Sequence, residues 1–192
     1  MKILLFLHGG SLNRGCEAIV RTGVAEIKTQ FPDAVIDLAS YEPETDAHLE
    51  NIHQVFRHEQ KPPKKFSWAG LKSAFFVKFF QDEKYHHQYT QKDIISKIKN
   101  YDVFISVGGD NYCYGELPGF YEINRLIKKA GKKLILWGAS IGEEDLTPAK
   151  IQDLQRFDLL LARETLTEKV LKNAGCKNVK LVAVGAFLME KT

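Results

Sequence analysis

Two apolar runs of this sequence end in loops whose residue types could hold a charged ligand. The run at residues 2–7 leads into His8–Glu17, a loop with three glycines, an asparagine and an arginine. The run at residues 101–106 leads into Val107–Tyr112, where paired glycines precede an acid and an amide. Short apolar runs of this kind are typical of buried parallel strands, and open α/β sheets bind ligands where such strands end. The sequence therefore predicts a ligand site formed by both loops.

The first loop is predicted to bind an anion through Gly10, Asn13, Arg14 and Gly15. A helix that starts after a glycine-rich loop offers unpaired N–H groups and a partial positive charge to phosphate or carboxylate. Arg14 could add a bidentate contact. The glycine spacing is that of neither a dinucleotide-binding nor a Walker loop. The alternative interpretation is a tight strand-to-helix turn with a solvated arginine.

The second loop contains the candidate catalytic residue, Asp110, which could act as a general acid or base or orient an acceptor hydroxyl. Gly108 and Gly109 would let the backbone approach the substrate closely, and Asn111 would bind it. The alternative is an Asx turn in which the side chain of Asp110 only satisfies the backbone.

Two more predicted strands end in polar residues at the same level. Arg163 could hold a carboxylate or phosphate in a fixed geometry, or instead pair with Glu164 or Glu168. Ser140 stands among glycines that keep the crevice open, where it could donate a hydrogen bond, although these residues could equally serve only the turn. His8 is more often structural than catalytic in such a place.

Apolar segments of strand and helix type alternate along the chain, which predicts an α/β fold with a doubly wound, mostly parallel, Rossmann-like sheet. Strands are expected near residues 2–7, 34–39, 102–107, 133–137, 157–162 and 178–184, and helices near 16–30, 90–99, 118–130, 147–156 and 165–174. If residues 52–56 form a third strand, the strand order 3-2-1-4-5-6 places the two glycine loops side by side. Residues 1–192 are expected to form one domain, with an irregular insertion near residues 42–90.

Composition excludes several classes of function. A net charge of +3 in 192 residues is too small to indicate nucleic-acid binding. The three cysteines lack the spacing of a zinc site or a disulfide framework, so we expect no metal and a reducing, cytoplasmic location. The first apolar run is too short for a signal peptide or a membrane span.

Aromatic residues with near-helical spacing fill residues 66–80, after a lysine-rich stretch at residues 61–65. A basic amphipathic helix can lie on an anionic membrane surface. The pattern favours a helix packed on the sheet or on a partner domain, and peripheral contact with the inner membrane face stays open.

The order and spacing of these motifs resemble the polysaccharide pyruvyltransferase family. The resemblance is carried by Gly9–Ala18, Ile105–Asp110, Gly138–Gly142 and Ala162–Glu164. It implies one half of a GT-B-like architecture, with the site in a cleft between two domains. It also implies transfer of pyruvate from phosphoenolpyruvate, the donor substrate, to two hydroxyls of a cell-surface glycan, free or lipid-linked, with no cofactor.

Members of that family are about twice as long, so we expect this chain to be an amino-terminal domain from which the carboxyl-terminal domain is absent. The proton donor is expected in that other half, and the chain alone is expected to be inactive. Two other interpretations stay open. One is half of a GT-B glycosyltransferase that uses a nucleotide sugar, and the other is a non-catalytic anion- or sugar-binding module.

Overall fold

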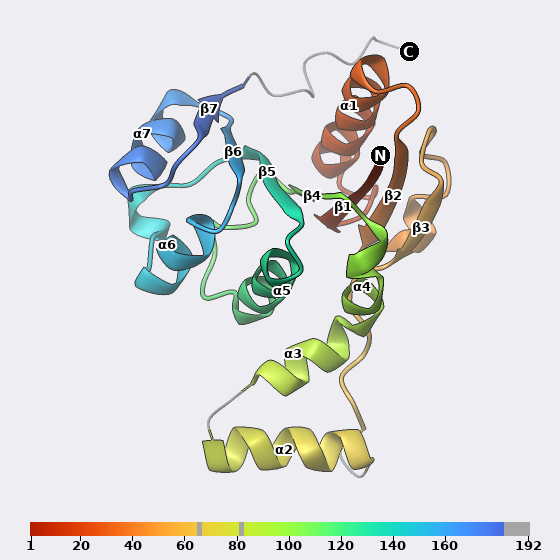
Figure 1. The fold of residues 1–192 in the computed structure, drawn as a ribbon, viewed down its shortest axis with the longest axis vertical. Helices are drawn as coiled ribbons and strands as arrows, with labels where there is room; N and C mark the ends of the chain where they lie inside the picture. The colour runs from red at the N-terminus through yellow and green to blue at the C-terminus, as the bar shows by residue number, and fades with distance from the viewer. Residues whose placement is uncertain (65–66, 81–82, 183–192) are drawn as a thin grey trace.

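A single parallel sheet forms the centre of the computed structural model, which describes residues 1–64, 67–80 and 83–182 (Figure 1). Its strands are β1 (Lys2–His8), β2 (Val35–Ser40), β3 (Gln54–Arg57), β4 (Val103–Val107), β5 (Lys133–Ala139), β6 (Leu159–Ala162) and β7 (Val179–Leu181). The strand predicted at residues 178–184 thus corresponds to β7, and residues 183 and 184 lie outside the described residues.

The strands are arranged in the order β3-β2-β1-β4-β5-β6-β7, and every neighbouring pair is parallel. This confirms the predicted doubly wound order, including the third strand: β3 pairs with β2, with Val55 opposite Leu38. The chain moves outward from β1 to β3 on one side and from β4 to β7 on the other. The reversal of direction therefore lies between β1 and β4, where doubly wound sheets form their ligand crevice.

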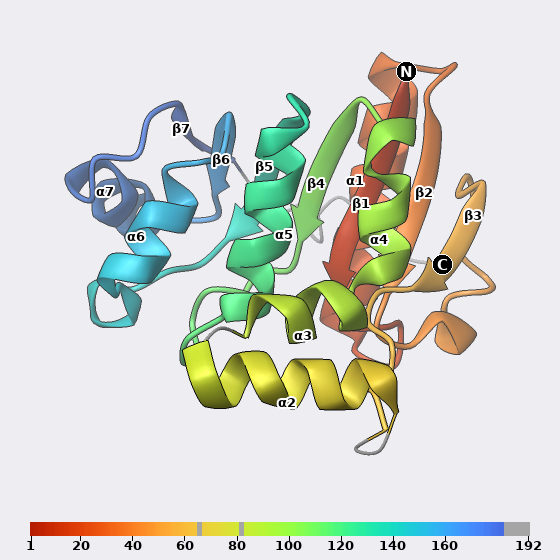
Figure 2. The ribbon, with the colours of Figure 1, turned by 60° about the horizontal axis from the view of Figure 1, so that its bottom comes forward.

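Helices cover both faces of the sheet. The α-helices are α1 (Arg14–Gln30), α2 (Trp68–Phe80), α3 (Lys84–Thr90), α4 (Lys92–Lys97), α5 (Pro118–Lys129), α6 (Pro148–Leu154) and α7 (Thr165–Asn173), and the short 3-10 helices are η1 (Pro43–Thr45), η2 (Ile98–Asn100) and η3 (Glu143–Asp145). Figure 2 shows α1 behind the central strands, with α4 and α5 in front of them.

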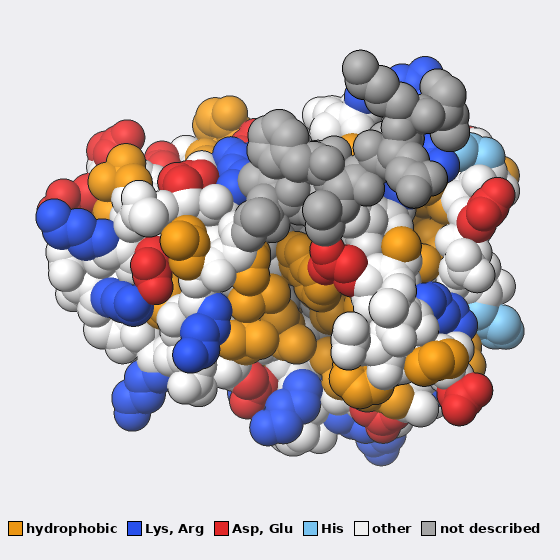
Figure 3. All heavy atoms as spheres, turned by 90° about the horizontal axis from the view of Figure 1, so that it is seen from above, with side chains coloured by type: hydrophobic (Ala, Val, Ile, Leu, Met, Phe, Trp, Pro, Cys, Tyr) orange, Lys and Arg blue, Asp and Glu red, His pale blue; other side chains and the backbone are white. Residues whose placement is uncertain are grey.

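The core follows the two-residue period of the strands, because successive side chains point to opposite faces of a sheet. Leu4 and Phe6 of β1 pack with Phe104 on the face covered by α4 and α5. Ile3 and Leu5 pack on the α1 face. Figure 3, a view from above, shows hydrophobic side chains gathered in the middle of the molecule.

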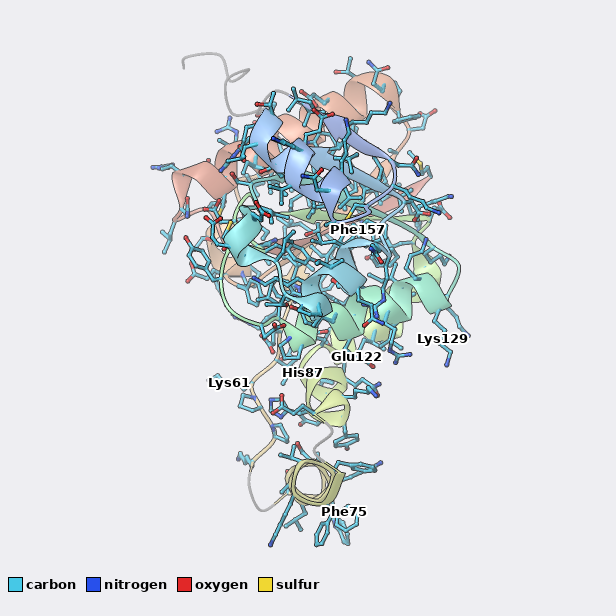
Figure 4. All side chains as sticks on the ribbon, turned by 90° about the vertical axis from the view of Figure 1, so that its left-hand side faces the viewer. Lys61, Phe75, His87, Glu122, Lys129 and Phe157 are labelled. Atoms are coloured by element: carbon cyan, nitrogen blue, oxygen red, sulfur yellow. The ribbon has the colours of Figure 1, made fainter. Side chains whose placement is uncertain are left out.

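The aromatic segment forms α2, as its spacing predicts, but α2 does not pack on the sheet. It lies beyond α3, at the end of the molecule (Figures 1 and 4). There the rings of Phe76 and Tyr85 stack at 6.1 Å, and the Lys72 ammonium lies 4.6 Å from the Tyr85 ring. Of the two packings expected for this helix, the one on the sheet is wrong, because α4 and α5 occupy the nearby face, and the one on a partner domain stays a prediction. No helix among the described residues is long and apolar enough to cross a membrane.

A buried histidine follows β3 at the carboxyl edge of the sheet. The His58 ring is fully buried, stacks on Tyr41 at 4.6 Å and lies 6.3 Å from the Phe6 ring. Within the described chain neither ring nitrogen has a hydrogen-bond partner. Burial lowers the pKa of His58 from 6.5 to about 3, because a charged imidazole cannot be solvated there.

We expect this histidine to make the fold acid-sensitive. As the pH falls below 6.5, His58 becomes protonated in the unfolded chain, but in the folded chain it stays neutral down to about pH 3. The folded state therefore loses stability relative to the unfolded state between these two pH values. The loss approaches ~1.4 kcal/mol per pH unit for one group. Urea unfolding at pH 7 and pH 5 measures how much free energy of unfolding is lost on acidification. This loss should be smaller for His58→Phe than for the parent chain or for His86→Phe. An equal loss in all three would show that His58 is not the cause.

Candidate functional site

The two glycine loops lie side by side, as the strand order predicted. Phe6 of β1 pairs with Ser106 of β4, and the Asn111 side-chain amide donates to the Leu7 carbonyl at 3.4 Å. Leu7 has φ 64, in the left-handed region that side chains other than glycine rarely adopt. The pairing of β1 with β2 shifts register at this point. Local strain in β1 thus accompanies the contact between the loops.

Paired glycines are required in the second loop because side chains occupy the space beside them. A Cβ atom on Gly108 would lie 2.2 Å from the Asn111 amide nitrogen. A Cβ atom on Gly109 would lie 2.9 Å from Nη1 of Arg163. Gly108 therefore makes room for the contact to β1, and Gly109 makes room for the arginine.

Five residues from three strand ends meet here, and we call them the Arg163 cluster: Gly109, Asp110, Ser140, Arg163 and Glu164. Nη2 of Arg163 lies 3.5 Å from Oδ1 of Asp110, and its Nε lies 3.4 Å from Oε2 of Glu164. The backbone N–H of Ser140 donates to the Gly109 carbonyl at 2.8 Å. The Asp110 side chain is 61% exposed and that of Arg163 is 30% exposed, so an incoming ligand can reach both.

Sequence reasoning missed the role of Glu164 in holding this cluster together. Glu164 is the N-cap residue of α7, and the hydroxyls of Ser140 and Thr167 both donate to its Oε1. Burial alone would raise the pKa of Glu164, but these hydroxyls and the Arg163 guanidinium hold it below its ordinary value. The only signal in the sequence was an acid placed between a strand and a helix. The alternative interpretation of Arg163, an ion pair with Glu164, therefore also holds.

Buried polar contacts anchor the far end of the second loop. The Tyr112 hydroxyl donates to Oδ2 of Asp153 at 2.6 Å, and the Asn124 amide donates to that hydroxyl at 3.0 Å. The Lys150 ammonium, itself buried, donates to the Tyr112 carbonyl at 2.8 Å. These contacts tie the loop to α5 and α6 and fix the backbone that presents Asp110.

The first loop is arranged around the start of α1. The Asn13 side chain caps this helix by accepting from the N–H groups of Gly15 at 2.9 Å and Cys16 at 3.3 Å. A ligand anion at these groups would have to displace that cap. Gly10 has φ +100, and a Cβ there would lie 2.8 Å from Cβ of Glu42, so the turn requires glycine.

Arg14 lies in a separate environment from Arg163. Its guanidinium pairs with Glu17 at 2.9 Å, and His48 contacts the same carboxylate at 2.9 Å. Hydrogen bonds from His48 and Arg14 lower the pKa of Glu17 from 4.5 to about 2. An open hollow of about 260 Å³ lies here, lined by Ser11, Leu12, Arg14, Thr45 and His48.

Cys16 lies between the two regions. Burial raises the pKa of the Cys16 thiol, and the negative charges of Asp110 and Asp46 raise it further. His8 is fully buried and contacts Asp46 at 3.1 Å, which is the structural role expected for it.

The Arg163 cluster can bind an anion and hold a carboxylate base next to it. A ligand carboxylate or phosphate could replace Asp110 on the guanidinium, which would leave the Asp110 carboxylate beside the ligand to accept a proton. Among the described residues, no group of three or more His, Cys, Asp or Glu side chains is placed to hold a metal ion.

The arrangement of strands and helices is that of one half of a GT-B glycosyltransferase. Similar solved structures include the lipopolysaccharide outer core galactosyltransferase WaaB, with a TM-score of 0.58 and 14% identity over 95% of this chain and 45% of that one. The Anabaena protein HepE, solved in complex with UDP, gives a TM-score of 0.54 and 15% identity over 96% of this chain and 44% of that one. At such low identity the likeness shows the fold alone.

The sequence profile of the polysaccharide pyruvyl transferase family matches residues 13–192, and the chain belongs to that family. It is 27% identical over 212 residues to the amylovoran biosynthesis protein AmsJ of Erwinia amylovora. That match covers 99% of this chain and 49% of AmsJ. The chain therefore spans about half the length of the relatives it matches.

We expect Tyr112→Phe to weaken the fold, because it removes a hydrogen-bond donor from the buried Asp153 carboxylate, while Asn124 keeps its own 2.8 Å hydrogen bond to that carboxylate. The expected loss in the free energy of unfolding is ~1–3 kcal/mol. Tyr114→Phe is the matched control, because Tyr114 is largely exposed. Urea unfolding of the parent chain and the two variants measures this loss. Equal stability of all three would show that the Tyr112 hydroxyl does not anchor the loop.

Three glycine-to-alanine changes should distinguish the stability lost through steric clashes in the loop from the stability gained by restricting the unfolded chain. Gly108→Ala must displace the Asn111 amide and should cost ~1–3 kcal/mol of stability. Gly109→Ala makes its one close contact with the far end of the Arg163 side chain, which can shift, and should cost less. Gly23→Ala, in α1 with nothing within 4 Å, should stabilise by ~0.5–1 kcal/mol. If Gly108→Ala and Gly23→Ala had similar urea midpoints, the packing of Asn111 against Gly108 described above would be contradicted.

Proposed function

We propose that this chain forms one wall of the site of a polysaccharide pyruvyl transferase. The reaction moves pyruvate from phosphoenolpyruvate to two hydroxyls of one sugar and gives a ketal. The observation that supports the proposal is the Arg163 cluster, which lies at the carboxyl ends of β4, β5 and β6 in a chain that belongs to this family. A glycan of an exported polysaccharide, free or lipid-linked, is the proposed acceptor.

The chemistry of phosphoenolpyruvate suits the cluster. Arg163 would hold the carboxylate or the phosphate in a bidentate contact. Protonation of the terminal carbon lets the first sugar hydroxyl add to the adjacent carbon, and Asp110 would accept the proton that this hydroxyl loses. The second hydroxyl then attacks the same carbon, the bond from that carbon to the phosphate oxygen breaks, and phosphate leaves with the proton of this hydroxyl, which completes the two C–O bonds of the ketal. Gly108, Gly109, Asn111 and Ser140 would line the substrate.

The proton donor for the terminal carbon is assigned to a second domain on the other side of the cleft. The support is the length of the relatives, of which this chain spans about half. A cytoplasmic location is also proposed, since Cys16, Cys113 and Cys176 are all free thiols.

A glycosyltransferase that uses a nucleotide sugar is the second candidate. It is favoured by the fold alone, because one similar structure is a galactosyltransferase and another was solved with UDP. The two candidates differ in the ligand that this half should bind, which makes them separable by binding measurements.

We expect phosphoenolpyruvate to raise the melting temperature of this chain, since a ligand at ~100 times its dissociation constant adds ~2.7 kcal/mol of stability. Arg163→Ala should remove most of that shift. Asp110→Asn should keep or enlarge it, because it removes a negative charge beside the bound anion. Arg21→Ala, on α1, is the control for loss of a surface arginine.

Differential scanning fluorimetry with phosphoenolpyruvate, inorganic phosphate and UDP decides between the candidates. A shift with UDP and none with phosphoenolpyruvate would favour the glycosyltransferase. A phosphoenolpyruvate shift that survives Arg163→Ala would place the anion site elsewhere.

A further inference from the structure

The outer side of α2 exposes a stripe of large apolar side chains. Trp68, Leu71, Phe75 and Phe79 follow one another at steps of three, four and four residues, which places them on one side of a helix. Their exposed fractions are 89%, 53%, 51% and 65%. Figure 4 looks along α2 and shows Phe75 on the side turned away from the rest of the molecule. We call these four residues the α2 stripe.

Lysines border the α2 stripe on both sides. At ~100° per residue, Lys72 and Lys78 fall on its two flanks, and both are exposed. Lys61 and Lys64, in the segment that precedes α2, are exposed as well. Between Glu59 and Asp82 the sequence holds five lysines and no aspartate or glutamate. The segment that contains the stripe therefore carries a positive net charge.

An apolar stripe between lysines is more stable at the interface of an anionic bilayer than exposed to water. Contiguous exposed apolar side chains are uncommon on soluble surfaces and mark contact sites. Trp and Phe side chains enter the headgroup region, while lysine ammonium groups stay level with lipid phosphates. Clustered lysines on such a helix are attracted to anionic lipids. A 13-residue helix is too short to cross the bilayer, so it would lie in the surface.

The stripe lies at the same end of the molecule as the candidate site. Gln91, just after α3, donates to the Gly119 carbonyl at 3.0 Å, and Gln88 of α3 donates to Glu122 at 2.6 Å. Both acceptors belong to the first turns of α5, which begins after the loop that carries Asp110. In Figure 2, α3 and α2 lie beyond the ends of β1 and β4 from which the two loops leave.

We propose that the α2 stripe and its lysines dock this protein on an anionic membrane surface. Docking holds the carboxyl edge of the sheet near the headgroups. A glycan carried on a membrane lipid then becomes the acceptor class within reach of Asp110, a consequence that rests on the proposed function. The docking itself rests only on α2 and its surroundings.

Vesicle co-sedimentation of this chain tests the docking. We expect binding to vesicles of equal parts phosphatidylglycerol and phosphatidylcholine, little binding to phosphatidylcholine alone, and weaker binding at high salt. Trp68 fluorescence should shift to the blue on binding, and the shift should be absent in Trp68→Phe.

Paired variants identify the surface. Trp68→Ser/Phe79→Ser should abolish vesicle binding, and Lys72→Glu/Lys78→Glu should weaken it by ~10-fold or more. The matched controls are Phe31→Ser/Leu166→Ser, which removes two exposed apolar side chains elsewhere, and Lys129→Glu/Lys177→Glu, which makes the same charge change elsewhere. Both controls should bind as the parent chain does. Circular dichroism spectra check that every variant is folded.

Three results would overturn the docking. The first is that the folded parent chain does not bind anionic vesicles, and the second is that the test and control variants lose binding equally. The third is that the chain forms a dimer in solution, which dissociates in Trp68→Ser/Phe79→Ser, and does not bind vesicles. The phosphoenolpyruvate shift is measured without vesicles, so it should persist in the α2 variants. Vesicle binding should likewise persist in Arg163→Ala, and the two proposals can fail independently.

Discussion

The parallel pairing of β1 with β4 is the constraint on which the rest of the structure depends. The chain leaves these neighbouring strands toward opposite edges of the sheet, so no crossover helix fills the space between their carboxyl ends. Two glycine-containing loops meet there, and the contact between Asn111 and the Leu7 carbonyl joins them. Every residue proposed to bind substrate is placed relative to this junction.

The polar groups around the junction are fixed by hydrogen bonds to residues behind the loops as well as by contacts with one another. Tyr112 is tied to α5 and α6 through Asp153, Asn124 and Lys150, all buried, and unpaired groups of this kind would be costly. Arg163 is held by Glu164, which is itself fixed by hydroxyl groups. The exposed end of the cluster is Asp110, whose side chain is more accessible than that of Arg163.

The same end of the molecule carries the candidate site and the apolar helix α2. A sheet of this type presents its ligand loops along one edge, and helices inserted next to that edge can bring a second surface close to it. In this chain the inserted segment between β3 and β4 provides α2 and α3. A transferase acting on glycans attached to lipid would use both surfaces at once, the loops for chemistry and the helix for position.

The sequence by itself determined the α/β class, the strand order and the places where the loops leave the sheet. These follow from local patterns: apolar runs of strand length, glycines after β1 and β4, and helical spacing between them. It also selected Asp110, Ser140 and Arg163, because polar residues at strand ends share one edge of a parallel sheet. Only the tertiary structure decided which of these residues touch one another.

Three outcomes required the fold. Asn13 caps α1 and Arg14 pairs with Glu17, away from Arg163, because both partners lie within one turn of the same helix. Glu164 and Tyr112 gained their roles from side chains distant in sequence, which no local pattern reveals. The helix at Trp68–Phe80 was predicted from its spacing, but its place beyond α3 was not, because α4 and α5 had already covered the sheet. Spacing specifies which side of a helix is apolar, and the space left by other elements decides what that side meets.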